Sequence, residues 1–129
     1  MREILFRGKR LDNGELVDGN LFVSDTDGRT YILAGSRIVT IEWEVDPSTV
    51  VQYTGLKDKN GKRIFEGDIV KTDKFSEPNK QYIIKYDLQF GAFIGQDRYN
   101  LYFVTFDGDS GEFEVIGNIH DNPELLEEA

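Results

Sequence analysis

The sequence predicts a mainly β fold: a small SH3-like, barrel-type domain built from hairpins, with a short C-terminal helix. Three observations carry this prediction. Runs rich in β-branched and aromatic residues are separated by turn residues roughly every ten positions along the chain. Asn-Gly pairs occur at Asn13-Gly14 and Asn60-Gly61, and such pairs favour hairpin turns because both residues tolerate a positive φ. Residues 37–45 alternate polar and apolar side chains, the pattern of a half-buried strand.

The first half of the chain is predicted to contain a series of strands. Strands at residues 2–11 and 15–23 flank the Asn13-Gly14 turn, and Asp25–Gly28 turns the chain toward a strand at residues 30–35. In the alternating strand, Val39, Ile41, Trp43 and Val45 lie on one face, which we expect to be the inner one. Pro47 has no amide hydrogen for a ladder, so we expect residues 46–49 to break this strand.

The second half continues with short strands. Residues 49–71 are predicted to form a double hairpin, strand–turn–strand–bend–strand, with the bend at Gly67. Further strands are expected at residues 80–88, 91–95, 99–106 and 112–119. Asn122 as N-cap and Pro123 at the first helical position predict the short terminal helix. The 129 residues form one domain, or two β subdomains that divide near residues 46–56.

Composition restricts the function classes. The chain has no cysteine, which excludes disulfides, thiolate nucleophiles and cysteine metal sites. No apolar run approaches the ~20 residues of a membrane helix, and the N-terminus lacks the apolar segment of a secretion signal. We therefore expect a cytoplasmic protein that does not associate with a membrane.

The net charge of −9 is unevenly distributed along the chain. From residue 107 onward no Lys or Arg occurs, and all the charged residues are acidic: Asp107, Asp109, Glu112, Glu114, Asp121, Glu124, Glu127 and Glu128. Such a region repels a phosphate backbone, because nucleic-acid affinity depends on Lys and Arg. It is either a solvated acidic face that aids solubility or a face for a basic partner, with Glu112 and Glu114 as candidate binding residues.

A basic window lies in the middle of the chain. The candidate binding residues here are Lys57, Lys59, Lys62 and Arg63, with Phe65 and Phe75 interleaved. Small barrels bind single-stranded nucleic acid through such basic and aromatic surfaces. The alternative is that the aromatic residues fill the core and the basic residues are simply solvated.

Three groups of residues could bind a metal or take part in catalysis, and each also has a purely structural explanation. The acidic loops at Asp25, Asp58 and Asp107 do not match the ligand spacing of a calcium loop, so we interpret them as turns. His120 is the only histidine, and we expect it to be exposed just before the final helix. Glu66 and Asp68 could act as an acid–base pair, but we favour a turn in which their carboxylates cap backbone amides or pair with Lys62 or Arg63. No catalytic residue, metal or cofactor is predicted.

Three sequence blocks are spread along the chain: the opening "REILFRG", then "VDPSTVVQYTGLKDKNGKRIFEGDIVK", and the closing "GNIHDNPELL". In these blocks, which together reach from start to end of the chain, the sequence resembles the YopX family of phage and prophage proteins. The resemblance implies a small, largely β protein that acts in the cytoplasm of a bacterial host. It implies no catalytic residues.

The function expected from the sequence is that of a non-enzymatic binding or interaction module of a phage or prophage. Its partner is expected to be a macromolecule, a protein rather than a nucleic acid, and homo-oligomerisation stays open. Two alternatives remain: an acidic DNA mimic or inhibitor of a host protein, and a nucleic-acid-binding small β-barrel.

Overall fold

The computed structural model describes residues 4–35, 38–72, 80–89, 91–97, 103–105 and 113–126 of the chain. These residues form strands and one short 3-10 helix, which confirms the predicted mainly β fold. The chain divides into two compact units, Met1–Tyr53 and Thr54–Ala129. Each unit has its own cluster of buried hydrophobic side chains.

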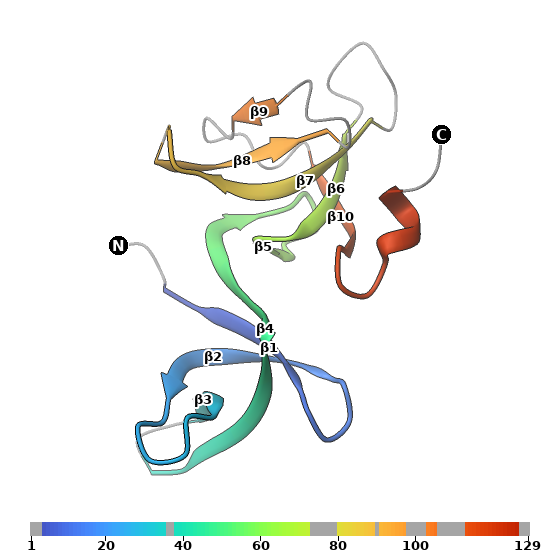
Figure 1. Cartoon of the computed structure of the whole chain (residues 1–129). Coiled ribbons are helices and arrows are strands. Elements are labelled where there is room, and N and C mark those ends of the chain that lie inside the picture. Colours follow the sequence, from blue (N-terminus) through green and yellow to red (C-terminus); the bar gives the residue numbers. More distant parts are fainter. Residues whose placement is uncertain are drawn as a thin grey trace. The chain divides into compact units, whose positions relative to one another are not determined.

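Four antiparallel strands form a ring, and they belong to the Met1–Tyr53 unit except for the last four residues of the fourth strand. They are β1 (Phe6–Arg10), β2 (Leu16–Val23), β3 (Thr30–Gly35) and β4 (Thr40–Lys57), drawn in blue to green in Figure 1. They pair in the order β1-β2-β3-β4, and β1 also pairs with β4, which closes the ring. The predicted turns are present: Gly14 and Gly28 have φ values of 74° and 70° between the strands. These two hairpins therefore follow from local turn chemistry.

The inner face of this ring holds a small apolar core. Val17, Ile32 and Val45 are buried, with exposed fractions of 9%, 0% and 1%. The partly buried side chains that pack against them are those of Phe6, Trp43 and Val50. Trp43 thus lies on the inner face, as the alternating pattern predicts, although it is only half-buried.

The expected strand break at residues 46–49 is wrong, because β4 continues through Pro47 to Lys57. The pairing of β1 with β4 shifts register, because Arg7 pairs with Val51 whereas Lys9 pairs with Asp46. The β4 strand therefore has extra residues between Asp46 and Val51, which form a bulge. Proline is tolerated at such a bulge, where its missing amide hydrogen costs no ladder bond. The Thr49 hydroxyl supports the bulge by accepting a hydrogen bond from the Lys9 amide, at 2.9 Å.

A second sheet of five antiparallel strands belongs to the Thr54–Ala129 unit. Its order is β10-β6-β7-β8-β9, with bounds Glu114–Asn118, Asp68–Thr72, Lys80–Asp87, Ala92–Gln96 and Phe103–Thr105. The short strand β5 (Arg63–Phe65) pairs with β4 and not with β6. The predicted double hairpin is therefore only half correct. The chain turns back at Asn60-Gly61, but at Gly67, where φ is 87°, it passes from one sheet to the other.

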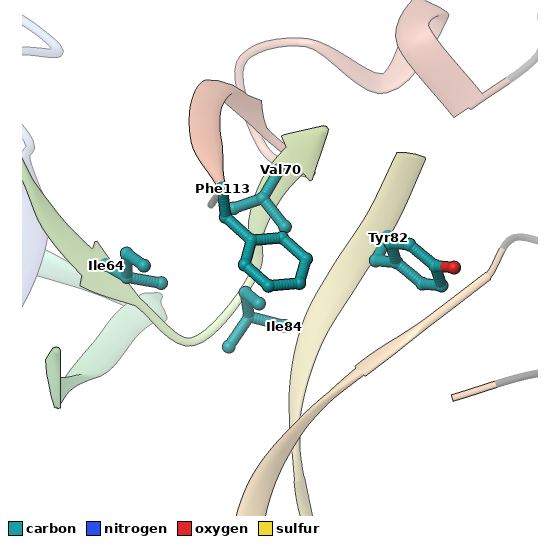
Figure 2. Close-up of a cluster of buried hydrophobic side chains, with 5 residues drawn as sticks. All are labelled: Ile64, Val70, Tyr82, Ile84 and Phe113. Carbon is teal, nitrogen blue, oxygen red and sulfur yellow. The ribbon is translucent and has the colours of Figure 1, made fainter. Parts of the chain in front are cut away.

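Buried side chains from several strands meet in this second unit. The cluster consists of Ile64, Val70, Tyr82, Ile84 and Phe113, and Figure 2 shows them gathered from β5, β6, β7 and the residue before β10. The rings of Tyr82 and Phe113 meet edge to face, with centroids 6.5 Å apart. Aromatic pairs favour this geometry because a positive ring edge faces a negative ring face.

The described part of the chain ends in a 3-10 helix of a single turn, Pro123–Leu126, where a short helix is predicted. The Leu125 amide donates to the Asn122 carbonyl at 3.1 Å, the three-residue spacing of a 3-10 turn. The Asn122 side chain accepts a hydrogen bond from the Asn118 amide at 3.3 Å, so it caps the preceding loop rather than the helix start.

Replacing Gly19 with alanine is expected to destabilise the Met1–Tyr53 unit by about 3 kcal/mol. A Cβ at this position would lie 2.2 Å from the Leu33 carbonyl oxygen, which belongs to the neighbouring strand and cannot move without breaking the ladder. Trp43 is the only tryptophan and lies in this unit, so urea unfolding followed by its fluorescence measures the change.

Gly14→Ala is the matched control for this variant. Gly14 has a φ of 74° but no atom within 4 Å of an added Cβ, so only backbone strain of about 1 kcal/mol is expected. Equal losses for the two variants would contradict the close approach of β2 to β3.

Candidate functional site

The loop after β4 is organised by the buried carboxylate of Asp58, which is 5% exposed. One of its oxygens accepts hydrogen bonds from the Asn60 and Lys62 amides, each at 2.9 Å. The other accepts from the Val115 amide of β10 at 3.0 Å. The Lys59 amide donates to the Phe113 carbonyl at 2.9 Å beside it. Asp58 therefore closes the predicted turn and also joins it to a strand far away in the sequence.

The pKa of Asp58 is set by two opposing causes. Burial raises it, because a charged carboxylate loses hydration. The hydrogen bonds from the Val115, Lys62 and Asn60 amides stabilise the charged form and outweigh burial, so the pKa lies below its ordinary value. Asp58 is thus held as a carboxylate by the backbone, which is a structural role and not that of a general acid.

The proposed acid–base pair of Glu66 and Asp68 is a turn. Asp68 is 4% exposed, and its carboxylate accepts a hydrogen bond from the Phe65 amide at 2.8 Å. The Gly67 amide donates to the Ile84 carbonyl at 2.8 Å, and the Gly67 carbonyl accepts from the Ile119 amide. Asp68 caps a backbone amide, as the favoured structural interpretation predicts, and Glu66 lies half-buried in the same turn.

The basic and acidic binding candidates partly neutralise each other. The Glu114 carboxylate lies 3.5 Å from the Lys59 ammonium and 3.7 Å from that of Lys71. Lys57 and Lys62 are exposed and Arg63 is half-buried, while Glu112 lies outside the described residues. Because Glu114 lies between two lysines, it weakens both a basic surface for nucleic acid and an acidic surface for a basic partner at this place.

Aromatic stacking is also missing from the described part of the basic window. Phe65 is 0% exposed and is part of the interior, and Phe75 lies outside the described residues. Stacking on bases requires an accessible ring face. The core alternative for Phe65 is therefore correct.

The remaining chemical candidates lie in turns. His120 is exposed, and its amide donates to the Asn118 side chain at 3.0 Å. In the Asp25–Gly28 turn the Asp27 carboxylate accepts from the Arg29 amide at 2.9 Å and from the Tyr31 hydroxyl at 3.0 Å. The Asp107 loop lies outside the described residues. Within the described ranges, no three His, Cys, Asp or Glu side chains are grouped to hold a metal ion.

A surface hollow of about 270 Å³ lies where β1 ends beside β4. Its lining comes from the end of β1 and the turn after it, and from the early part of β4: Arg10, Leu11, Asp12, Glu42, Trp43 and Glu44. The Arg10 guanidinium lies 5.9 Å from the centroid of the Trp43 ring and forms two hydrogen bonds with Asp12, at 2.9 and 2.6 Å. The hydrogen bond from Arg10 lowers the pKa of Asp12. The hollow thus combines an apolar ring with three carboxylates and one guanidinium.

Beside this hollow, the start of β4 exposes its apolar side chains. Ile38 and Val39, just before the strand, and Ile41 within it are 93%, 59% and 45% exposed, and we call these three residues the apolar start of β4. The alternating pattern predicts that Val39 and Ile41 lie on the inner face with Val45, and this expectation of burial is wrong. Strand β1 pairs with β4 only from Val45 onward, so it does not cover this stretch.

Sequence reasoning missed this region because its signal is ambiguous. An apolar residue every second position predicts a strand face but does not say how far the covering strand extends. Arg10 and Asp12, at the end of one predicted strand, carried no motif that would link them to Trp43. Only the pairing of β1 with β4 brings them together.

The fold and this surface first define a class: a mainly β protein with two antiparallel sheets, one of which contains a ring of four strands. A family model described as YopX protein matches residues 5–127, so the chain belongs to the YopX family. The family expected from the sequence blocks is thereby confirmed. Across the described ranges, no helix is long and apolar enough to cross a membrane.

Two solved structures are similar over nearly the whole chain. Protein EF1440 from Enterococcus faecalis is 28% identical with a TM-score of 0.60, over 98% of this chain and 99% of that one. YopX from Bacillus subtilis is 19% identical with a TM-score of 0.56, over 100% of this chain and 99% of that one, and it supports the fold alone. No curated protein matches the chain. None of these comparisons names a function.

Proposed function

We propose that this chain is a non-enzymatic binding module that docks onto another protein. The observation that carries the proposal is the exposure of the apolar start of β4, where Ile38, Val39 and Ile41 are 93%, 59% and 45% exposed. Water-exposed apolar side chains gathered in one place mark interaction surfaces, because covering them is favourable. The hollow is lined by Glu42 and Trp43, which follow Ile41 directly in β4.

A protein partner is favoured over nucleic acid by the charges in the structure. The net charge is −9, and the Lys59 and Lys71 ammonium groups share the Glu114 carboxylate. Phosphate binding needs several accessible Lys and Arg side chains, each replacing a counterion. The apolar start of β4 instead offers surface that an apolar protein partner would cover. We place this activity in the bacterial cytoplasm, as an accessory function of a phage or prophage, because the YopX resemblance implies that setting.

Affinity capture with the tagged full chain from a bacterial host lysate tests the proposal. The test variant is Val39→Thr with Ile41→Thr, which keeps β-branched side chains in the strand but removes apolar surface. The wild-type chain is expected to retain a protein that the double variant retains at least about tenfold less, since burying each side chain contributes about 1–2 kcal/mol.

Leu88→Thr is the matched control, because Leu88 is 89% exposed in a turn of the other unit. It should retain the same protein as the wild type. The proposal is overturned if the double variant retains every protein as well as the wild type, or if only nucleic acid co-purifies.

A further inference from the structure

The early part of β4 has one paired edge and one open edge. On one side, Thr40–Glu44 pairs with β3 from Gly35 back to Tyr31. On the other side, β1 reaches only as far as Leu11, whose amide donates to the Glu44 carbonyl at 3.1 Å. Among the described residues, no strand pairs with this side of Thr40–Trp43.

The open edge presents backbone groups in strand spacing. In an antiparallel strand, the amide and carbonyl of alternate residues point to the same edge. Because the Glu44 carbonyl points toward β1, the amides and carbonyls of Glu42 and Thr40 point to that same edge, away from β3. An open strand edge of this kind is a template for another extended segment.

The hollow lies at the open edge of β4, where β1 ends. Its lining includes Trp43 and Leu11, which suit the apolar stem of a long side chain. Its three carboxylates exceed its one guanidinium by two negative charges. Asp12 is paired with Arg10, and Glu44 lies 3.8 Å from Arg29. Glu42 forms no ion pair with any described residue, and it is the acidic residue within Thr40–Trp43.

We propose that the open edge of β4 at Thr40–Trp43 accepts an extended, basic segment of the partner protein, which adds a strand beside β4. Backbone groups of the segment pair with Thr40 and Glu42, a Lys or Arg side chain enters the hollow, and apolar side chains cover Ile41. Strand addition of this kind draws affinity from the backbone and specificity from side-chain pockets. The inference rests on the proposed function and adds the mode of docking.

Charge decides between a basic segment and a second copy of this chain. Two copies would bring together chains of net charge −9 each, with Glu42 of each copy at the shared edge. A basic segment instead neutralises the acidic rim and keeps the apolar contact. The same surface therefore favours a basic partner over self-association.

The experiment uses the full chain as bait for short random peptides displayed on phage, followed by synthesis of the enriched peptides. The expected peptides alternate Lys or Arg with β-branched or aromatic residues. The key variant is Glu42→Pro, which removes an amide hydrogen that points away from β3, so the existing ladder is kept. Glu42→Gln keeps the amide hydrogen and removes only the charge.

Distinct results are expected for the two variants. Glu42→Pro should weaken peptide binding at least about tenfold, because one backbone hydrogen bond is lost and the ring of proline blocks the edge. Glu42→Gln should weaken it about threefold and reduce its salt dependence. Asp25→Asn, an exposed acid that does not line the hollow, is the control and should change nothing. Unchanged Trp43 fluorescence would show that each variant keeps the fold.

Four outcomes would overturn the inference: no enriched peptide, enriched peptides without basic residues, binding unaffected by Glu42→Pro, or a wild-type dimer in sedimentation that this variant dissociates. The last result would make a second copy the occupant. Lysate capture that depends on Val39 and Ile41 but not on Glu42→Pro would leave the proposed function standing while overturning strand addition.

Discussion

Replacing Phe113 with alanine is expected to destabilise the Thr54–Ala129 unit by about 3–5 kcal/mol. The ring is 2% exposed and lies among Ile64, Val70, Tyr82 and Ile84, as Figure 2 shows. Its removal exposes apolar surface, opens a cavity and ends the edge-to-face contact with Tyr82.

Amide hydrogen exchange measures this change where it occurs. The ladder between β6 and β7, which pairs Val70 with Tyr82, should exchange faster in Phe113→Ala. Phe113→Leu is the matched variant, because it keeps most of the apolar volume, and it should lose less than half as much stability. Equal losses for leucine and alanine, or none for either, would show that Phe113 does not fill this core.

Replacing Asp58 with alanine is expected to destabilise the same unit by about 3 kcal/mol. The substitution leaves the Asn60, Lys62 and Val115 amides without their shared acceptor. Hydrogen bonds to a charged acceptor are stronger than neutral ones, and amides left unpaired in a partly buried place add a desolvation cost. Urea unfolding followed by far-UV circular dichroism gives the change in unfolding free energy.

The control is the pH dependence of the stability that Asp58→Ala loses. The pKa of Asp58 is lowered in the folded chain from the ordinary 3.8, so its charge stabilises the fold above that pH. That contribution disappears as the pH falls through the folded pKa, so the difference between wild type and Asp58→Ala should narrow below about pH 3.8. Asp58→Asn should show an intermediate loss. A difference that stays constant down to low pH would contradict the charged role.

The parts of the fold that depend on local chemistry could be predicted from the sequence. Asn13-Gly14 and Asn60-Gly61 mark turns because few other residues accept a positive φ, and the structure has turns at both places. Asp68 was expected to cap a turn through its carboxylate, and it accepts from the Phe65 amide. These features need only neighbouring residues, so the sequence alone is sufficient.

The parts that depend on distant residues could not be predicted in this way. Pro47 is compatible with β4 only because the pairing with β1 has a bulge there. The partner of β5 is β4 rather than β6, and no local pattern around Gly67 decides this. Likewise, Ile41 is exposed because β1 ends at Arg10, before it reaches that part of β4. Each outcome is set by where a distant strand begins or ends.

The residues that build the fold differ from the residues proposed to bind a partner. The glycines and aspartates of residues 52–70 organise turns and join strands, and their polar groups are engaged by the backbone. The features that remain available to a partner lie elsewhere, at Trp43, Glu42 and the apolar start of β4. The residues that define the YopX signature and the residues proposed to bind are therefore largely different sets.

The most direct test of partner binding at residues 38–44 is amide hydrogen exchange on the full chain, alone and bound to the protein that it captures from the host lysate. Binding is expected to slow exchange at residues 38–44, with little change at residues 58–68. Protection concentrated around Asp58, Glu66 and Asp68, with residues 38–44 unchanged, would contradict it.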